Sequence, residues 1–225
     1  GEGGHDAGDL KVLLMEEALK HVLSKGWTQA AVIQAAEDLE MSPAVGGLME
    51  RGEVELVEFF VAKCNREMAA AVAASKEELD ALPLRERLGR ILRLRLEMVG
   101  PYAAVWPQAL ALLADPRHAP RSLQGLAMLS DDIWHLAGDS SADATWYTKR
   151  AALGALYSAA EVYMLTDFSP GFEDTWSFLD RRLADLAGLG TSGDEVGHYV
   201  EAILEGIGGS VKAVFGRLPG APPRP

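Results

Sequence analysis

The sequence predicts an all-α protein, because apolar residues recur with the period of a helix and nowhere alternate as they do in a strand. The first example is an amphipathic i, i+3, i+4 series formed by Val12, Met15, Ala18, Leu19 and Val22. Gly and Pro interrupt this periodicity at intervals, as is typical of connections between helices. The 225 residues, 48% hydrophobic and 24% charged, are enough to bury a substantial core.

The first part of the chain predicts three helices joined by short turns. The first helix ends at Gly26, a residue type suited to a helix C-terminus. Thr28 is a predicted N-cap for the second helix. Ser42 as N-cap and Pro43 in the first helical position begin a short third helix, which is expected to end near Gly52.

The remainder of the chain predicts longer helices separated by Pro and polar turns. They cover approximately residues 53–75, 84–99, 102–114, 121–137, 145–165 and 172–188. Residues 189–193 are Gly-rich and are an expected linker to a last helix over residues 194–218. The Pro-rich tail 219–225 cannot continue that helix, and residues 1–8 are expected to be disordered.

Charge and cysteine content narrow the function classes. The formal net charge is −12 and the isoelectric point is near 4.9, which argues against nucleic acid as the main partner. The one cysteine, Cys64, cannot form a disulfide within the chain and is expected to be a buried, inert thiol. No apolar run is long enough to span a bilayer.

The first three helices resemble the helix-turn-helix module of TetR-type repressors. The resemblance rests on residues 43–49 and on the strings Gly26-Trp27-Thr28 and Leu39-Glu40-Met41-Ser42. It implies a helix-turn-helix-like part over residues 9–52 and a larger ligand-binding helical part over residues 53–188. In that family the short third helix enters the major groove. Here no Lys or Arg lies between Lys25 and Arg51, so the segment lacks cationic donors for phosphates and bases, and no nucleic-acid partner is expected.

The middle of the chain resembles the Coq-nine family of ubiquinone (coenzyme Q) biosynthesis proteins. The most specific strings are Asp131-Asp132-Ile133-Trp134-His135 and Trp146-Tyr147-Thr148-Lys149-Arg150. The resemblance implies a TetR-like, non-catalytic homodimer that binds isoprenoid quinone intermediates or phospholipid. It also implies a place on the matrix face of the mitochondrial inner membrane. There the protein is expected to present substrate to the demethoxyubiquinone hydroxylase (Coq-seven).

An exposed aromatic patch for docking this enzyme is expected around the two strings. Its candidate residues are Asp131, Ile133, Asp143, Trp146 and Tyr147. Aromatic residues flanked by carboxylates are typical interface anchors, and the family resemblance implies that the region of Trp146 and Tyr147 contacts the hydroxylase. The alternative is that Trp146 packs into the core as a staple at the start of a helix.

Two further sites are predicted on apolar faces of helices. Candidates for lining a lipid pocket are Leu96, Val99, Leu110, Leu113, Leu126 and Leu156, although a stripe of this kind is more often plain core. The amphipathic last helix is a candidate membrane contact through Val196, Tyr199, Val200, Ile203, Leu204, Ile207, Val211, Val214 and Phe215. The alternative is that this helix docks on the core of its own chain or of a partner.

Two other function classes stay open. A ligand-sensing transcription regulator would need a basic recognition helix, which is missing. A di-iron oxidoreductase would need carboxylate and His ligands from several helices. The pairs Asp132 with His135 and Glu195 with His198 have a suggestive i, i+3 spacing, but capping and surface roles explain them better. We therefore expect no metal, no cofactor and no catalytic residue.

Overall fold

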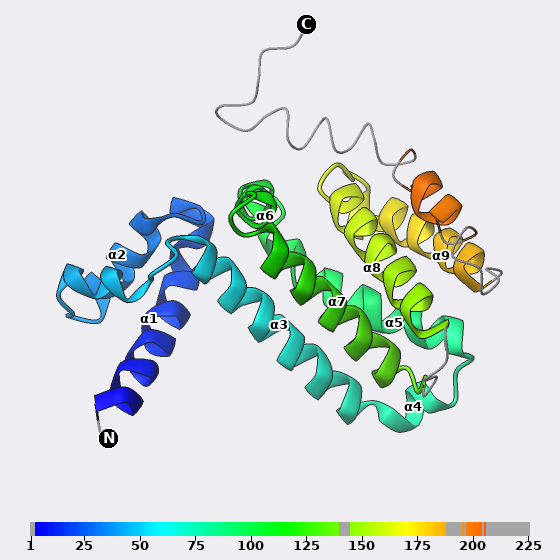
Figure 1. Cartoon of the computed structure of the whole chain (residues 1–225), viewed down its shortest axis with the longest axis horizontal. Coiled ribbons are helices and arrows are strands. Elements are labelled where there is room, and N and C mark those ends of the chain that lie inside the picture. The colour runs from blue at the N-terminus through cyan, green and yellow to red at the C-terminus, as the bar shows by residue number, and fades with distance from the viewer. Residues whose placement is uncertain (1–2, 140–144, 188–194, 196, 204, 206–225) are drawn as a thin grey trace, which may run out of the picture. The chain divides into compact units, whose positions relative to one another are not determined.

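The computed structural model describes residues 3–139, 145–187, 195, 197–203 and 205. All regular elements within these residues are helices, which confirms the predicted all-α class (Figure 1). The elements are α1 (Gly3–Lys25), α2 (Gln29–Asp38), η1 (Pro43–Leu48), α3 (Val54–Ala74), α4 (Lys76–Asp80), α5 (Leu84–Glu97), η2 (Gly100–Tyr102), α6 (Trp106–Ala114), α7 (Ala119–Leu136), α8 (Thr145–Met164), η3 (Pro170–Phe172) and α9 (Glu173–Ala187).

The chain divides into two compact units. The first contains Gly1–Cys64 and Ala104–Ala119, and the second contains Asn65–Ala103 and Pro120–Pro225. The division falls within α3, whereas the sequence analysis placed it near residue 52. The difference arises because α6, distant in sequence, packs with the first helices, and sequence periodicity does not report such long-range contacts.

An aromatic cluster forms the centre of the first unit. The ring of Trp27 lies 5.3 Å from that of Phe60 and 5.4 Å from that of Trp106, measured between centroids. Phe60 and Trp106 are also 5.4 Å apart, in an edge-to-face arrangement that aromatic pairs favour. Each ring is nearly or fully buried. Because these residues come from three distant parts of the sequence, the cluster joins α6 and α3 to the turn between α1 and α2.

The turn after α1 depends on Gly26. This residue has a φ of +72°, which side chains with a Cβ adopt only at a cost. A Cβ at this position would also lie 2.5 Å from Oε1 of Gln108. That same oxygen accepts a hydrogen bond of 2.9 Å from the backbone N–H of Trp27. Gly26 is therefore required both by its backbone angle and by the close approach of α6.

The helix-turn-helix-like segment differs in detail from expectation. Thr28 has the extended backbone of an N-cap, but its hydroxyl donates to the Lys25 carbonyl rather than capping α2. The third helix is a 3-10 helix of six residues, η1, that stops before Gly52. Gly46 and Gly47 lower the helix propensity of this segment, which accounts for the short element. Helices α1 and α2 pack side by side (Figure 1).

Helix α1 begins at Gly3 and so includes residues 3–8, which the sequence led us to expect outside a helix. No Pro interrupts this stretch, and adding turns to an existing helix is far less costly than starting a new one. The predicted burial of Cys64 is confirmed, since the residue is only 2% exposed.

The second unit buries one face of α5 against neighbouring helices. The buried positions of α5 are Leu88, Ile91, Leu92, Arg95 and Leu96. Helices α8 and α9 lie side by side (Figure 1), with the rings of Tyr163 and Phe178 stacked at 4.8 Å. The short helix α4, which the sequence analysis did not anticipate, connects α3 to α5. Among the described residues, no helix has the length and apolarity that crossing a bilayer demands.

Candidate functional site

An aromatic pair begins α8, where the sequence analysis expected a docking patch. The rings of Trp146 and Tyr147 meet edge to face, with centroids 4.7 Å apart. Tyr147 is 75% exposed, whereas Trp146 is half-buried. An exposed tyrosine supported by a tryptophan is a surface feature typical of protein interfaces.

The guanidinium of Arg150 contacts the Trp146 residue of this pair. Its central carbon is 4.2 Å from the centre of the Trp146 ring, a cation–π contact. Its Nε donates to Asp131 on α7 at 2.5 Å, and its Nη1 donates to the backbone carbonyl of Trp146 at 3.3 Å. Arg150 is only 8% exposed and connects Asp131 with Trp146. It was not among the predicted docking residues, because a charged side chain is ordinarily expected at the surface. Its i+4 spacing from Trp146 was the available signal.

A second set of contacts fixes the end of α7 to the start of α8. The indole N–H of Trp134 donates to the Lys149 carbonyl at 3.1 Å. The Lys149 ammonium lies 5.5 Å from the Trp134 ring centre and 3.2 Å from Asp139. Asp139 also lies 3.8 Å from Nη1 of Arg150. The two helices therefore hold the aromatic pair through both backbone and side-chain contacts.

One of the other predicted docking residues does not contribute in the expected way. Ile133 is fully buried, so it belongs to the core and offers no surface to a partner. It lies two residues after Asp131, and positions two apart on a helix face different directions. Asp143 lies outside the described residues. Asp131 keeps 48% of its side chain exposed at the edge of the aromatic pair.

A pocket of about 230 Å³ opens in the second unit, between the end of α3, α4 and α5. It is lined by Ala71, Val72, Ser75, Glu78, Leu79, Arg90, Ile91 and Leu94. Apolar side chains form most of the lining, while Ser75, Glu78 and Arg90 are exposed polar groups. This combination suits an apolar chain with a polar group at one end.

None of the six residues predicted to line a lipid pocket lies in this one. Leu96, Val99 and Leu156 are fully buried in the second unit and are core residues, while Leu126 is half-buried. Leu110 and Leu113 are half-buried in the first unit. Helical periodicity finds inward-facing residues but does not distinguish close packing from a cavity, so these six positions stay a prediction.

The described part of the last helix packs on the protein. Tyr199 and Ile203 are 6% and 1% exposed, and the Tyr199 hydroxyl donates to the Arg182 carbonyl of α9 at 2.9 Å. Burial raises the pKa of Tyr199 above its ordinary value. These two residues were expected to contact a membrane, and their burial shows that this expectation was wrong for them. Val200 is half-buried. The other predicted membrane residues, Val196, Leu204, Ile207, Val211, Val214 and Phe215, lie outside the described residues.

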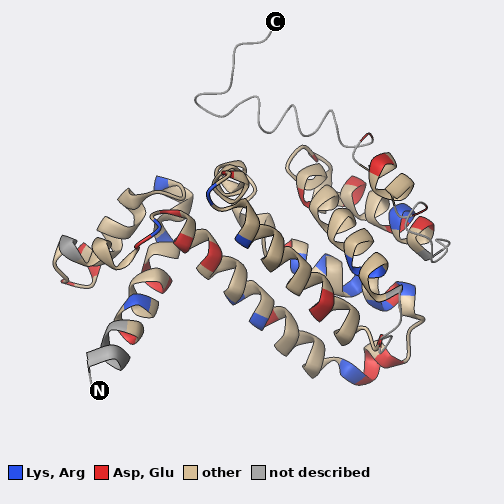
Figure 2. Ribbon diagram, viewed as in Figure 1, with Lys and Arg blue, Asp and Glu red and all other residues tan. Residues whose placement is uncertain are grey.

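Helix α2 and η1 form the segment that would contact DNA in a TetR-type repressor, and the sequence predicts no nucleic-acid partner for it. Helix α2 and the following η1 contain no Lys or Arg, and the ribbon of α2 carries acidic but no basic positions (Figure 2). Asp38 at the end of α2 has a lowered pKa, chiefly because Gln34 donates a hydrogen bond to it. The segment is therefore acidic where a groove-reading helix would carry cationic donors.

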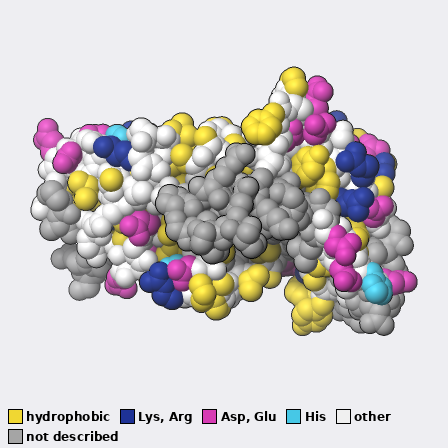
Figure 3. All heavy atoms as spheres, turned by 90° about the horizontal axis from the view of Figure 1, so that it is seen from above, with side chains coloured by type: hydrophobic (Ala, Val, Ile, Leu, Met, Phe, Trp, Pro, Cys, Tyr) yellow, Lys and Arg dark blue, Asp and Glu magenta, His cyan; other side chains and the backbone are white. Residues whose placement is uncertain are grey.

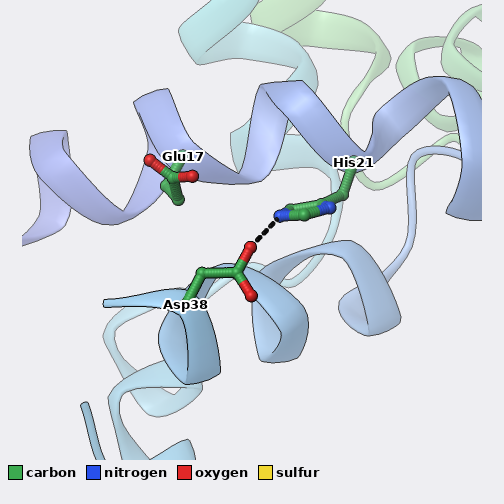
Figure 4. A group of neighbouring side chains, drawn as sticks. All are labelled: Glu17, His21 and Asp38. Carbon is green, nitrogen blue, oxygen red and sulfur yellow. Dashed lines mark ion pairs between the residues drawn. The ribbon is translucent and has the colours of Figure 1, made fainter. Parts of the chain in front are cut away.

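Glu17, His21 and Asp38 come together between α1 and α2 (Figure 4). Their candidate ligand atoms all lie within 4.8 Å of one another. His21 Nε2 is 2.7 Å from Asp38, while Lys20 donates to Glu17 at 2.6 Å. Since each carboxylate already has a partner, we interpret the group as a polar contact, in which the His21–Asp38 pair links the two helices. The sequence-suggested pairs at Asp132 and at Glu195 belong to no such three-residue group within the described residues.

Exposed apolar side chains occur on both units. On the face seen in Figure 3 they form small groups among charged residues. The large exposed ones in the described residues are Val12, Leu13, Leu23, Ile33, Leu84, Leu123, Met128, Tyr147 and Phe168. Phe168, at 89% exposed, is a second surface aromatic in the loop that follows α8.

Known proteins resemble the chain over most of its length. The sequence profile of the COQ9 family matches residues 119–190, which include α7, α8 and the aromatic pair. The ubiquinone biosynthesis protein COQ9, mitochondrial, of Xenopus tropicalis is 38% identical over 214 residues, covering 93% of this chain and 68% of that protein. The protein of the same name from Homo sapiens is 35% identical over 221 residues, covering 93% and 69%.

One solved structure resembles the fold. A TetR transcriptional regulator from Nitrosomonas europaea superposes with a TM-score of 0.64 and 15% identity, covering 80% of this chain and 99% of the regulator. This likeness confirms the predicted TetR-like architecture and concerns the fold alone.

Proposed function

Because the chain belongs to the COQ9 family of ubiquinone biosynthesis proteins, we propose that it is a non-catalytic, lipid-binding factor that docks the demethoxyubiquinone hydroxylase. Family membership supports a role in ubiquinone biosynthesis. The relatives are named mitochondrial, and we place this chain on the matrix face of the inner membrane. There it binds an isoprenoid quinone intermediate or phospholipid and presents substrate to the enzyme.

The observation that carries the docking proposal is the Trp146–Tyr147 pair, in which Tyr147 is 75% exposed and Trp146 is half-buried. Its edge-to-face rings, 4.7 Å apart, present an aromatic surface beside the half-exposed carboxylate of Asp131. Aromatic anchors with a charged rim contribute most of the binding energy in many interfaces. The pair also lies within the segment that matches the family profile.

The pocket between α3, α4 and α5 supports lipid binding of limited extent. Its volume of about 230 Å³ is below the range of roughly 300–1,000 Å³ that is usual for sites enclosing a whole ligand. We therefore assign it to part of a ligand, with the apolar chain against Val72, Leu79 and Ile91 and a polar group toward Arg90.

The last helix contributes a proposed membrane contact. Its buried residues Tyr199 and Ile203 would anchor it to the protein, and the remaining apolar positions of the segment would face lipid. We also propose a homodimer, as the family resemblance implies. Size-exclusion chromatography with light scattering measures the mass of the protein in solution. A dimer requires about twice the 24.1 kDa chain mass. A monomeric mass at micromolar concentration would contradict it.

Binding of the purified hydroxylase to immobilised protein tests docking. Tyr147→Ala is expected to weaken binding about tenfold or more, since it removes the exposed anchor. Phe168→Ala is the matched control, because Phe168 is also a highly exposed aromatic residue but follows the far end of α8, roughly 25 Å away by helix rise. Unchanged affinity in Tyr147→Ala would refute docking through this pair.

Native mass spectrometry with lipid extraction tests cargo binding. We expect a quinone or phospholipid to accompany the purified protein. A protein that is empty, and stays empty after incubation with quinone-loaded liposomes, would refute lipid presentation and leave a docking scaffold. Metal analysis of the same sample tests the alternative of a di-iron oxidoreductase, which requires stoichiometric iron.

A further inference from the structure

Arg150 is a permanently charged residue in a buried position. Its side chain is 8% exposed, although arginine is rarely buried unless it is paired. Three close contacts compensate the charge here, together with the Asp139 carboxylate, which lies 3.8 Å from Nη1. The close contacts are the Asp131 carboxylate at 2.5 Å, the Trp146 carbonyl at 3.3 Å and the face of the Trp146 ring at 4.2 Å.

Two of these three contacts involve Trp146 itself. The guanidinium covers one face of the indole ring, and the same group binds the carbonyl of that residue one helical turn away. Asp131, which comes from α7, holds the guanidinium from the other helix. The side chain of Trp146 thereby contacts both Arg150 and Tyr147, whose ring meets it edge to face.

We infer that Arg150 is a positioning residue for docking. It holds Trp146 in one orientation, so that the Trp146–Tyr147 pair is preorganised before the partner enzyme arrives. The inference rests on the proposed docking function and deepens it. Preorganisation increases affinity because fewer side-chain rotamers have to be immobilised on binding.

Arginine suits this role better than lysine. A planar guanidinium can stack on a ring while its edge N–H groups bind a carboxylate and a carbonyl, whereas an ammonium cannot meet all three demands. Lysine at this position would keep the positive charge near Asp131 but lose the stacked plane. Arg150→Lys therefore separates charge from geometry.

The chain contains a matched control. Arg93 stacks on Trp176 at 4.6 Å and binds Glu97 at 2.8 Å, so it has the same cation–π contact and a carboxylate partner. Arg93 is half-exposed and lies on α5, outside the aromatic pair. Arg93→Lys thus changes a similar contact without touching the docking surface.

Fluorine NMR of the free protein labelled with 5-fluorotryptophan tests the positioning directly. The Trp146 resonance is assigned by its loss in Trp146→Phe. In Arg150→Lys this resonance is expected to broaden or move, while those of Trp27 and Trp106 stay in place. Arg93→Lys should move only the Trp176 resonance. An unaltered Trp146 resonance in folded Arg150→Lys would overturn the inference.

A double-mutant cycle with the purified hydroxylase tests the consequence for binding. Arg150→Lys is expected to weaken binding about tenfold, and to cause no further loss when Trp146→Ala is already present, because the two residues act as a unit. Losses that multiply would show that Arg150 acts independently of Trp146, contrary to the inference. Arg93→Lys should bind as the unmodified protein does.

A second variant covers the case in which Arg150→Lys fails to fold. Asp131→Asn removes the half-exposed carboxylate that holds the guanidinium. Because Asp131 is itself a proposed docking residue, the decisive readout is the Trp146 resonance of the free protein, which should shift. If Trp146→Ala and Tyr147→Ala both bind the hydroxylase normally, the docking function fails. If they weaken binding but Arg150→Lys and Asp131→Asn do not, only the role of Arg150 fails.

Discussion

Gln108 and Trp27 are joined across 81 residues by a hydrogen bond of 2.9 Å, from the Trp27 backbone N–H to the Gln108 side-chain carbonyl. The bond brings α6 against the turn that follows α1. It is also what makes the space beside Gly26 so small, because the same oxygen lies 2.5 Å from the position of a Cβ there.

Gly26→Ala should therefore destabilise the protein. The left-handed backbone with a Cβ costs about 1–2 kcal/mol, and displacing Gln108 from its hydrogen bond costs about 1 kcal/mol more. Urea unfolding followed by circular dichroism measures the change. Gly125→Ala is the control, since it lies in α7 with open space around it and should stabilise the helix by up to roughly 1 kcal/mol. Equal stability of Gly26→Ala and the unmodified protein would contradict the role of Gly26.

Substitutions at Ile133 and Tyr147 should have different effects on the free energy of unfolding. Ile133→Ala removes a fully buried side chain and is expected to cost roughly 2–5 kcal/mol of unfolding free energy. Tyr147→Ala removes an exposed one and should change stability by no more than about 0.5 kcal/mol. Thermal unfolding of both variants checks the difference. A stable Ile133→Ala protein would mean that this residue is not part of the core.

Asp167 makes the start of α9 sensitive to acid. Burial raises the pKa of this carboxylate, but hydrogen bonds from the N–H and hydroxyl groups of Ser169 and Thr175 outweigh burial and lower the pKa below its ordinary value. The unfolded chain therefore binds the proton more readily than the fold does. The resulting stability is present above about pH 4 and is lost as pH falls further.

Asp167→Asn is accordingly expected to lose about 1–3 kcal/mol at neutral pH, because the amide nitrogen cannot accept the bonds that one carboxylate oxygen accepted. The difference from the unmodified protein should shrink below about pH 4. Unfolding free energies between pH 3 and pH 7 check this. Asp180→Asn, on the exposed side of α9, provides the control. A difference that stays constant down to pH 3 would show that the charge of Asp167 is unimportant.

The pocket can be filled without disturbing the core. Ala71→Phe places a ring in the pocket and should reduce binding of a prenylated benzoquinone about tenfold, with little change in the unfolding temperature. Ala73→Phe, on the exposed face of the same helix, should bind as before. Quenching of tryptophan fluorescence by the quinone measures both affinities. Normal binding by Ala71→Phe would place the ligand elsewhere.

Local sequence patterns determined the helices, most of their ends, the acidic helix-turn-helix-like segment and the family. These follow from neighbouring residues, since apolar spacing and Gly or Pro interruptions act within one or two turns. The strings around Trp134 and Trp146 were specific enough to identify the family without any structure.

Only the tertiary structure decided which apolar residues are core and which are surface. Ile133, Leu96, Tyr199 and Ile203 have the same apolar character as exposed residues of the chain, and their burial depends on packing that the local sequence does not report. The same holds for the extent of the first unit, which Trp106 and Gln108 join from far along the chain. Arg150 shows this most clearly, because a charged side chain is expected at the surface from sequence alone and this one is buried. Asp131 and Trp146, brought together across two helices, are what make its burial favourable.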